Sequence, residues 1–190
     1  KGDKYFGICT LMATLPGLPM FGHGQVEGFS EKYGMEFRRA YLEEHVDPYL
    51  VERHERETFP LLHKRQIFAN VDLFRMYDFY ANNGSVHEDV FAYSNSDGRE
   101  HALVVFNNRF SDVEGWVNLS CTQAVRVGGE KHAQRSKLAD NLHIAGKPNN
   151  FCIARDSISG LEYIRPSSEI QEKGLHLSLH AYQYFVFIEF

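Results

Sequence analysis

The residues best suited to chemistry lie in a glycine-rich loop near the start of the chain, Gly22-His23-Gly24-Gln25. Histidine is the side chain that most readily hydrogen-bonds a hydroxyl or moves a proton near neutral pH. The flanking glycines give the backbone the freedom to turn the imidazole into a cleft, and the amide of Gln25 can bind sugar-like hydroxyls. A loop histidine that binds nothing is an equally good explanation. The order of residues does not match a nucleotide-binding glycine motif.

A second stretch, EEHVDPYLVERHERE at 43–57, is rich in groups that bind metals. It contains no HExxH motif and no close histidine pair of the kind that zinc sites use. We therefore interpret it as a solvated helix face whose charges pair with one another, and we expect no metal and no cofactor. The metal ligands considered and set aside are His45, His54, Glu43, Glu44 and Glu52.

Other catalytic signatures are missing from the sequence. It has no G-x-S-x-G elbow and no phosphate-binding loop. Trp116 can stack on a sugar ring, although packing in the core is the favoured interpretation. The three cysteines, Cys9, Cys121 and Cys152, form no CxxC pair, which favours buried free thiols in a reducing compartment.

Composition narrows the class of protein further. Apolar residues make up 43% of the 190, enough for a globular core. The net charge of −5 and the pI near 6.1 argue against nucleic-acid and anionic-membrane partners. No apolar run approaches the roughly 20 residues of a transmembrane helix. The chain begins with lysine and without a signal-peptide pattern, so we expect a fragment, with the cytoplasm as its location.

The elements that must position the loop begin with a helix over residues 4–15, where apolar residues recur at helical spacing. Asp3 is its expected cap, and Pro16-Gly17 should end it. Residues 18–21 are apolar and predict a short buried strand that leads into the loop. A polar loop covers 22–46. Asp47-Pro48 then predicts the start of a helix over 48–56, with a break near Thr58 before a second helical segment.

From residue 73 the pattern changes to short aromatic and β-branched runs separated by turns, which is typical of an antiparallel sandwich or barrel. In the last run, alternate residues on both faces are apolar, so we expect a strand buried on both sides. Residues 122–150 predict a polar excursion that is helical or irregular. The predicted strands are 73–80, 90–94, 101–108, 115–120, 151–155, 161–164, 175–180 and 182–190.

The run LMATLPGLPMFGHGQVEGF resembles the last-strand segment of the catalytic barrel in the α-amylase superfamily, glycoside hydrolase family 13. The matching residues are Leu15 to Phe21, then Gly24. TFPLLHKRQ resembles the final barrel helix, and HALVVFNN and HAYQYFVFIEF resemble strands of the C-terminal sandwich. The resemblance implies an α+β fold in two parts. Residues 1–70 form a short helix–strand–helix remnant of a (β/α)8 barrel, and residues 71–190 form an antiparallel β-sandwich.

The resemblance also implies the function of a longer parent protein, a glycoside hydrolase or glucanotransferase that acts on α-glucosidic bonds by double displacement. Retaining hydrolysis needs two carboxyl groups about 5–5.5 Å apart, and the strands that carry them in the family are absent here. We therefore assign no catalytic residue to this chain and expect the chain alone to be inactive. The sugar contacts implied are His23 and Gln25, with Gly22 and Gly24 shaping the loop. The family's acidic pair is replaced by Gln25-Val26-Glu27.

The expected partners are an α-glucan or oligosaccharide, the rest of the barrel, and a second copy of the fragment wherever the helix and strand over 5–21 remain uncovered. A non-catalytic sandwich module that supports a barrel or binds carbohydrate is the alternative function. A free-standing enzyme is a third hypothesis, and it predicts turnover of maltooligosaccharides by this chain. The sequence does not specify substrate length, linkage, or hydrolysis against transfer.

Overall fold

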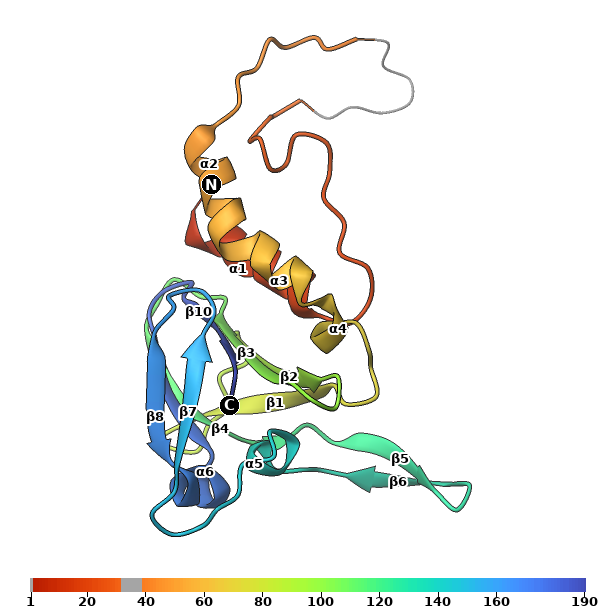
Figure 1. Cartoon of the computed structure of the whole chain (residues 1–190), viewed down its shortest axis with the longest axis vertical. Helices are drawn as coiled ribbons and strands as arrows, with labels where there is room; N and C mark the ends of the chain where they lie inside the picture. Colours follow the sequence, from red (N-terminus) through yellow and green to blue (C-terminus); the bar gives the residue numbers. More distant parts are fainter. Residues whose placement is uncertain (1, 32–38) are drawn as a thin grey trace.

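The structure is a computed structural model that describes residues 2–31 and 39–190, and only the backbone of residues 125–127. A group of helices lies on one side of a large antiparallel sheet (Figure 1). The helical elements are α1 (Asp3–Thr14), α2 (Pro48–Arg53), a π-helical turn (His54–Thr58), α3 (Phe59–His63), α4 (Arg65–Phe68), α5 (Leu138–Asn141) and α6 (Ser167–Lys173). The strands are β1 (Arg75–Ala81), β2 (Val90–Ser96), β3 (His101–Asn107), β4 (Val113–Ser120), β5 (Gln123–Val127), β6 (Glu130–Gln134), β7 (Phe151–Asp156), β8 (Glu162–Pro166), β9 (Leu175–Leu179) and β10 (Tyr184–Ile188).

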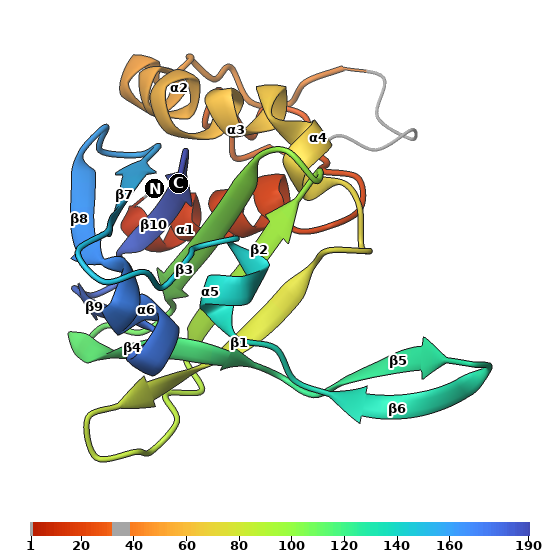
Figure 2. The ribbon, with the colours of Figure 1, turned by 60° about the horizontal axis from the view of Figure 1, so that its bottom comes forward.

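Eight strands form one sheet in the order β8-β7-β10-β3-β2-β1-β4-β9, and all the neighbouring pairs are antiparallel. These are the eight strands predicted from the sequence. The sheet curls around α5 and α6 into a sandwich-like fold (Figures 1 and 2). The α+β class and the antiparallel sandwich are therefore confirmed.

The excursion after β4 differs from the prediction over part of its length. Residues 123–134 form the hairpin β5–β6, which projects from the body in Figure 2. Its turn is Gly128-Gly129, and both residues have positive φ, 61° and 92°. Such a pair favours a two-residue hairpin turn, and this signal was missed. The helical interpretation holds for α5 alone, and α6 was not predicted.

Both faces of the central strands are buried, as the apolar character of the last strand predicted. Phe185 and Phe187 of β10 join the core that α5 and α6 close on the curled side of the sheet. Val186 and Ile188 pack on the other face, in a core shared with α1, α3 and α4. Strand β10 is fully buried because it lies between β3 and β7 and has a layer on each side.

Helix α1 lies close against the sheet. A Cβ added at Gly7 would stand 2.2 Å from the ring of Phe106, so only glycine permits this approach of helix to strand. The helix ends at Thr14 beside Pro16-Gly17, as predicted. The prediction that Asp3 caps α1 is wrong, because Gly2 occupies the N-cap and Asp3 instead pairs with Arg53 at 2.8 Å.

The second helical region contains the predicted break. Asp47 caps α2 by accepting hydrogen bonds from the backbone N–H groups of Tyr49 and Leu50. The turn His54–Thr58 is π-helical, and Phe59 N–H bonds to His54 O. The π-helical turn ends two residues before Pro60. Proline has no N–H group, so it cannot continue the hydrogen-bond pattern of the α-helix.

The predicted buried strand over residues 18–21 is wrong. These residues pair with no strand among the described residues, and Leu18 and Met20 are 85% and 73% exposed. A strand needs neighbours to satisfy its backbone hydrogen bonds, and residues 18–21 have none in the described part of this chain. Instead, the guanidinium of Arg65 donates to the carbonyls of Ala13, Leu15 and Gly17 and so satisfies the end of α1.

Candidate functional site

The four predicted site residues form one tight turn. It lies at the base of an arm, residues 26–31 and 39–46, that projects beyond the helices (Figure 1). Gln25 N–H donates to Gly22 O at 3.1 Å, and Gly22 N–H donates to the Gln25 side-chain oxygen at 3.0 Å. Gly24 has φ +67°, and a Cβ there would lie 2.6 Å from the Cβ of Phe29. The glycine at 24 is therefore required by the turn itself.

His23 and Gln25 occupy different surroundings within this turn. The imidazole of His23 is exposed, and its centroid lies 6.3 Å from the ring of Phe29. Gln25 is half-buried, and its backbone carbonyl accepts a hydrogen bond from Tyr5 Oη at 3.3 Å. Burial raises the pKa of Tyr5 to about 12, so its hydroxyl remains a donor at neutral pH. The turn is thereby tied to helix α1.

The two irregular segments of the arm are held together by carboxylates. The carboxylate of Glu44 accepts the N–H groups of Ser30 and Glu31, and the carboxylate of Glu31 accepts those of Tyr41 and Leu42. The hydrogen bonds from the N–H groups of Glu31 and Ser30 lower the pKa of the Glu44 carboxyl group, and the bond from Glu31 has the larger effect. Both glutamates therefore organise the backbone. Residues 32–38 lie outside the described part of the chain.

A cleft of about 380 Å³ between the helices and the sheet contains a buried polar network. Glu57, 7% exposed, accepts hydrogen bonds from the buried hydroxyl of Tyr184 and from Arg53 Nε at 3.1 Å. Arg56 Nη2 also donates to it at 2.9 Å. Arg53 in turn reaches Asp3 and stacks over the ring of Phe6 at 4.1 Å.

This network shifts the acidity of its members. Burial alone would raise the pKa of Glu57, but the hydrogen bonds from Tyr184, Arg56 and Arg53 more than offset it and the pKa is lowered. Burial, with the neighbouring carboxylate, raises the pKa of Tyr184. Glu57 is thus ionised at neutral pH.

A second carboxylate of the cleft, Asp156, is committed in the same way. It accepts the backbone N–H groups of Val186 at 3.0 Å, Ile158 at 3.3 Å and Ser159 at 3.0 Å, together with the Ser159 hydroxyl. Carboxylates whose lone pairs are occupied by protein donors serve to fix structure.

The stretch 43–57 was interpreted as a solvated helix face, and this is wrong at two positions. His54 is fully buried among the rings of Tyr5, Phe6 and Phe59, and it hydrogen-bonds Tyr5 Oη at 2.9 Å. Glu57 is buried in the cleft. In a helix of 3.6 residues per turn, His54 and Glu57 lie on the same face. The charged residues between and around them led to the prediction that this face is solvated. Within the residues described, no group of three or more His, Cys, Asp or Glu is arranged to hold a metal ion.

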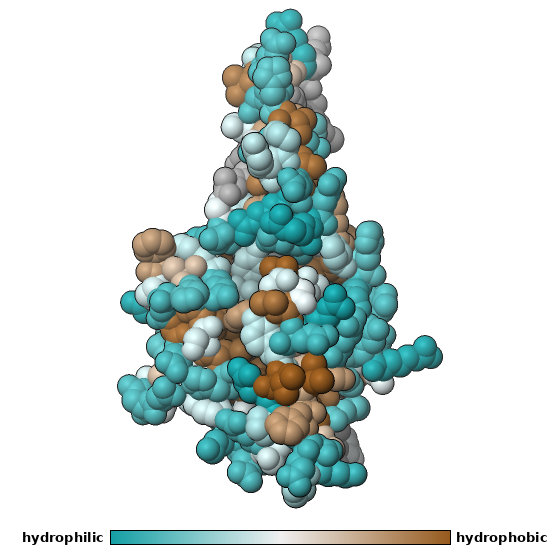
Figure 3. Space-filling view, turned by 60° about the vertical axis from the view of Figure 1, so that its left-hand side comes forward, coloured by the Kyte–Doolittle hydropathy of each residue, from teal (hydrophilic) through white to brown (hydrophobic). Residues whose placement is uncertain are grey.

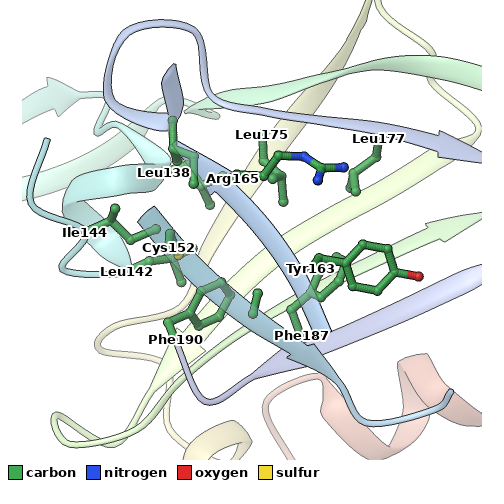
Figure 4. A pocket seen from close by; sticks show the side chains of 12 residues that line it. Leu138, Leu142, Ile144, Cys152, Tyr163, Arg165, Leu175, Leu177, Phe187 and Phe190 are labelled. Atoms are coloured by element: carbon green, nitrogen blue, oxygen red, sulfur yellow. The ribbon is translucent and has the colours of Figure 1, made fainter. Parts of the chain in front are cut away.

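A further cavity lies within the core of the sheet. Figure 4 shows an apolar cavity of about 20 Å³ beneath the curled sheet, lined by side chains including Leu142, Cys152 and Phe187. That volume is close to the space of one water molecule, so no sugar fits it. Cys9, Cys121 and Cys152 form no disulfide with one another. The prediction of buried cysteines holds for Cys9 and Cys152, whereas Cys121 is half-buried.

Two apolar surfaces are exposed. One lies along the arm and its base, and the other covers the β7–β8 hairpin at the sheet edge, where Figure 3 shows apolar side chains gathered. The arm surface consists of Leu18, Met20, Tyr41, Leu42, Val46 and Tyr49, and the hairpin surface of Phe151, Ile153, Leu161 and Ile164. No helix in the described residues is long and apolar enough to cross a membrane.

The sequence matches no family model and no curated protein significantly, but solved structures share its fold. A noncanonic maltogenic α-amylase AmyB from Thermotoga neapolitana has a TM-score of 0.59 at 11% identity, over 99% of this chain and 36% of its own. An α-amylase from Geobacillus thermoleovorans, solved with acarbose, has a TM-score of 0.57 at 14% identity, over 98% of this chain and 33% of its own. A cyclomaltodextrin glucanotransferase, CldA, has a TM-score of 0.53 at 16% identity, over 98% of this chain and 32% of its own.

The fold of this chain is therefore one found within α-amylases and glucanotransferases, as the sequence resemblance implied. The chain spans about a third of the length of these solved proteins. At 11–16% identity, the likeness establishes the fold.

Two features of the structure were not predicted from the sequence. The buried Glu57–Tyr184 pair joins residues 127 positions apart, and no local pattern marks such a contact. Trp116 was expected in the core, but it is half-buried on the outer face of β4. The alternation along β4 contained this signal, because its neighbours Gly115 and Val117 are the buried ones.

Proposed function

We propose that this chain is the C-terminal part of an α-amylase-like glycoside hydrolase or glucanotransferase that acts on α-glucosidic bonds. The observation that carries the proposal is the match of nearly the whole chain to about a third of several α-amylases and a glucanotransferase. In this assignment, residues 1–70 are the last αβ portion of a catalytic barrel and residues 71–190 are the C-terminal sandwich domain.

The exposed apolar arm supports the barrel assignment. Leu18 and Met20 lie in the segment that resembles the last barrel strand, and both are largely exposed. In a complete barrel, neighbouring strands would pair with this segment and cover these side chains. The rest of the barrel is thus the partner that we assign to the arm. The same exposed residues are the ones through which the isolated chain would self-associate.

The turn Gly22–Gln25 then takes its place at the C-terminal end of a barrel strand, the end where barrel enzymes bind their substrates. His23 would hydrogen-bond sugar hydroxyls from its exposed position. Gln25 would hold the turn, because its side-chain oxygen accepts the Gly22 N–H. The carboxylates of the reaction would come from earlier barrel strands, as the resemblance to the family implies. Glu57 and Asp156 of this chain accept hydrogen bonds from the protein's own donors.

The natural protein that contains this chain tests the proposal. It should hydrolyse or transfer maltoheptaose with retention of the α configuration, because double displacement at a retaining site preserves the anomer. The 190-residue chain alone should do neither. If the longer protein is folded but does not turn over maltoheptaose, the result would instead favour a non-catalytic sandwich that supports a barrel or binds carbohydrate.

We also propose a reducing compartment, the cytoplasm, as the location. The support is that the three cysteines form no disulfide with one another, and that two of them are buried.

A further inference from the structure

Trp116 lies in the middle of a row of three rings on the outer face of the sheet. Tyr80 of β1 and His176 of β9 stand directly opposite it in register. Neighbouring strands are about 4.8 Å apart, so the row extends across three strands. The adjacent Phe79 and Val117 are fully buried in the core behind it. The sheet therefore presents an aromatic strip on a face that these three strands leave uncovered.

The indole of Trp116 is held in place by its neighbours. Its Nε1–H donates to the side-chain oxygen of Asn82 at 3.2 Å. The imidazole of His176 lies 4.7 Å from it, centroid to centroid, at an interplanar angle of 58°. A ring fixed in this way loses little side-chain entropy when a ligand stacks on it.

A hollow of about 440 Å³ adjoins this strip, within the range of roughly 300–1,000 Å³ typical of small-ligand sites. Trp116 and Tyr80 supply aromatic surface, and Asn118 and Lys173 supply polar groups. Among the described residues, the side-chain oxygen of Asn118 is buried and accepts no hydrogen bond. The lining residues are Tyr80, Gly84, Trp116, Asn118, Leu119 and Lys173.

The charges around the strip are largely paired. His176 Nε2 lies 3.2 Å from Glu114 Oε1, and Arg135 pairs with Asp78 at 3.2 Å. Lys173 is the one charged side chain among the residues that line the hollow. Its ammonium group can donate hydrogen bonds to the hydroxyls of a neutral ligand. A flat aromatic surface beside amide and amine groups suits a ligand with apolar C–H faces and a rim of hydroxyls.

We propose that this hollow binds a neutral oligosaccharide through stacking on Trp116 and Tyr80. The choice of an α-linked glucan as its ligand rests on the proposed function. The preference for a neutral sugar rests only on the rings and polar groups that line the hollow. Asn118 and Lys173, which also line the hollow, hydrogen-bond the sugar hydroxyls.

Trp116 is the single tryptophan of the chain, so its fluorescence reports on this hollow alone. Titrating the 190-residue chain with maltoheptaose should give a saturable fluorescence change in the micromolar-to-millimolar range. Tyr80→Ala should weaken binding about ten-fold by removing a stacking ring. Asn118→Ala keeps both rings and should weaken it several-fold. Phe151→Ala, at an exposed ring on β7, is the matched control and should leave the affinity unchanged.

Two results would overturn the proposal: no saturable change at millimolar maltoheptaose, or equal affinity in the wild type, Tyr80→Ala and Asn118→Ala. Circular dichroism of each variant establishes that the sheet is folded, and Tyr80→Phe, which keeps the ring, should restore binding if Tyr80→Ala disturbs the strand. Turnover by the longer natural protein is a separate readout. If the 190-residue chain binds maltoheptaose but the longer natural protein does not turn it over, the proposed function is rejected and this binding site is retained.

Discussion

Removing the carboxylate of Glu57 should destabilise the docking of the helices on the sheet by about 2–4 kcal/mol. Breaking a buried ion pair from one side costs about 3–5 kcal/mol, because the remaining partner is left unpaired. Arg53 and Arg56 are 26% and 58% exposed, so water compensates them in part and the expected cost is lower. Tyr184, at 6% exposure, has no such compensation.

The assay is urea unfolding of Glu57→Ala, followed by circular dichroism. Glu57→Gln keeps the shape and an acceptor for Tyr184 but loses the charge, and should cost about 1–2 kcal/mol. Glu55→Ala, an exposed glutamate in the same π-helical turn, should change stability by no more than about 0.5 kcal/mol. If Glu57→Ala costs no more than Glu55→Ala, the network does not hold the helices to the sheet.

The same network predicts a pH dependence. The pKa of Glu57 is lowered in the folded state, so its stabilisation is complete above the unfolded-state value of about 4.3 and is lost as the pH falls through the folded value. The difference in unfolding free energy between wild type and Glu57→Gln should therefore be full at pH 7 and shrink in strongly acidic buffer. A difference that stays constant down to pH 2 would contradict this assignment.

Other substitutions probe the turn and the end of α1. Arg65→Ala should cost about 1–3 kcal/mol and speed amide hydrogen exchange near Leu15, because it leaves three carbonyls without their donor; exchange unchanged from wild type would refute this role. Gly24→Ala should destabilise the arm by about 1–2 kcal/mol or more, since φ is +67° and Phe29 is too close, whereas Gly98→Ala, with φ +90° and open space, should cost less. His23→Ala should leave the melting temperature unchanged and lower kcat/KM for maltoheptaose about ten-fold in the longer natural protein; equal activity would remove His23 from the sugar contacts.

The strands could be predicted because their signals are local. In β10, alternate apolar residues on both faces required a layer on each side, and the structure has both. Turn residues such as Ser96-Asp97-Gly98 mark where one strand ends and the next begins. These signals depend on a few neighbouring residues.

The missed elements depend on partners distant in the sequence or absent from it. Residues 18–21 have the composition of a strand, but a strand forms only against a neighbour, and none is present in the described residues. His54 and Glu57 alternate with charged residues that face water, and only α1 and β10 show that these two are inside. The grouping of Gly22, His23, Gly24 and Gln25 in one turn was predictable because they are contiguous.

The most direct test of the account is an activity comparison on maltoheptaose between the natural protein that contains this chain and the 190-residue chain alone. The product anomer is followed by proton NMR. The account predicts α-configured products from the natural protein and no turnover by the isolated chain. Turnover by the isolated chain, or β-configured products from the natural protein, would contradict it.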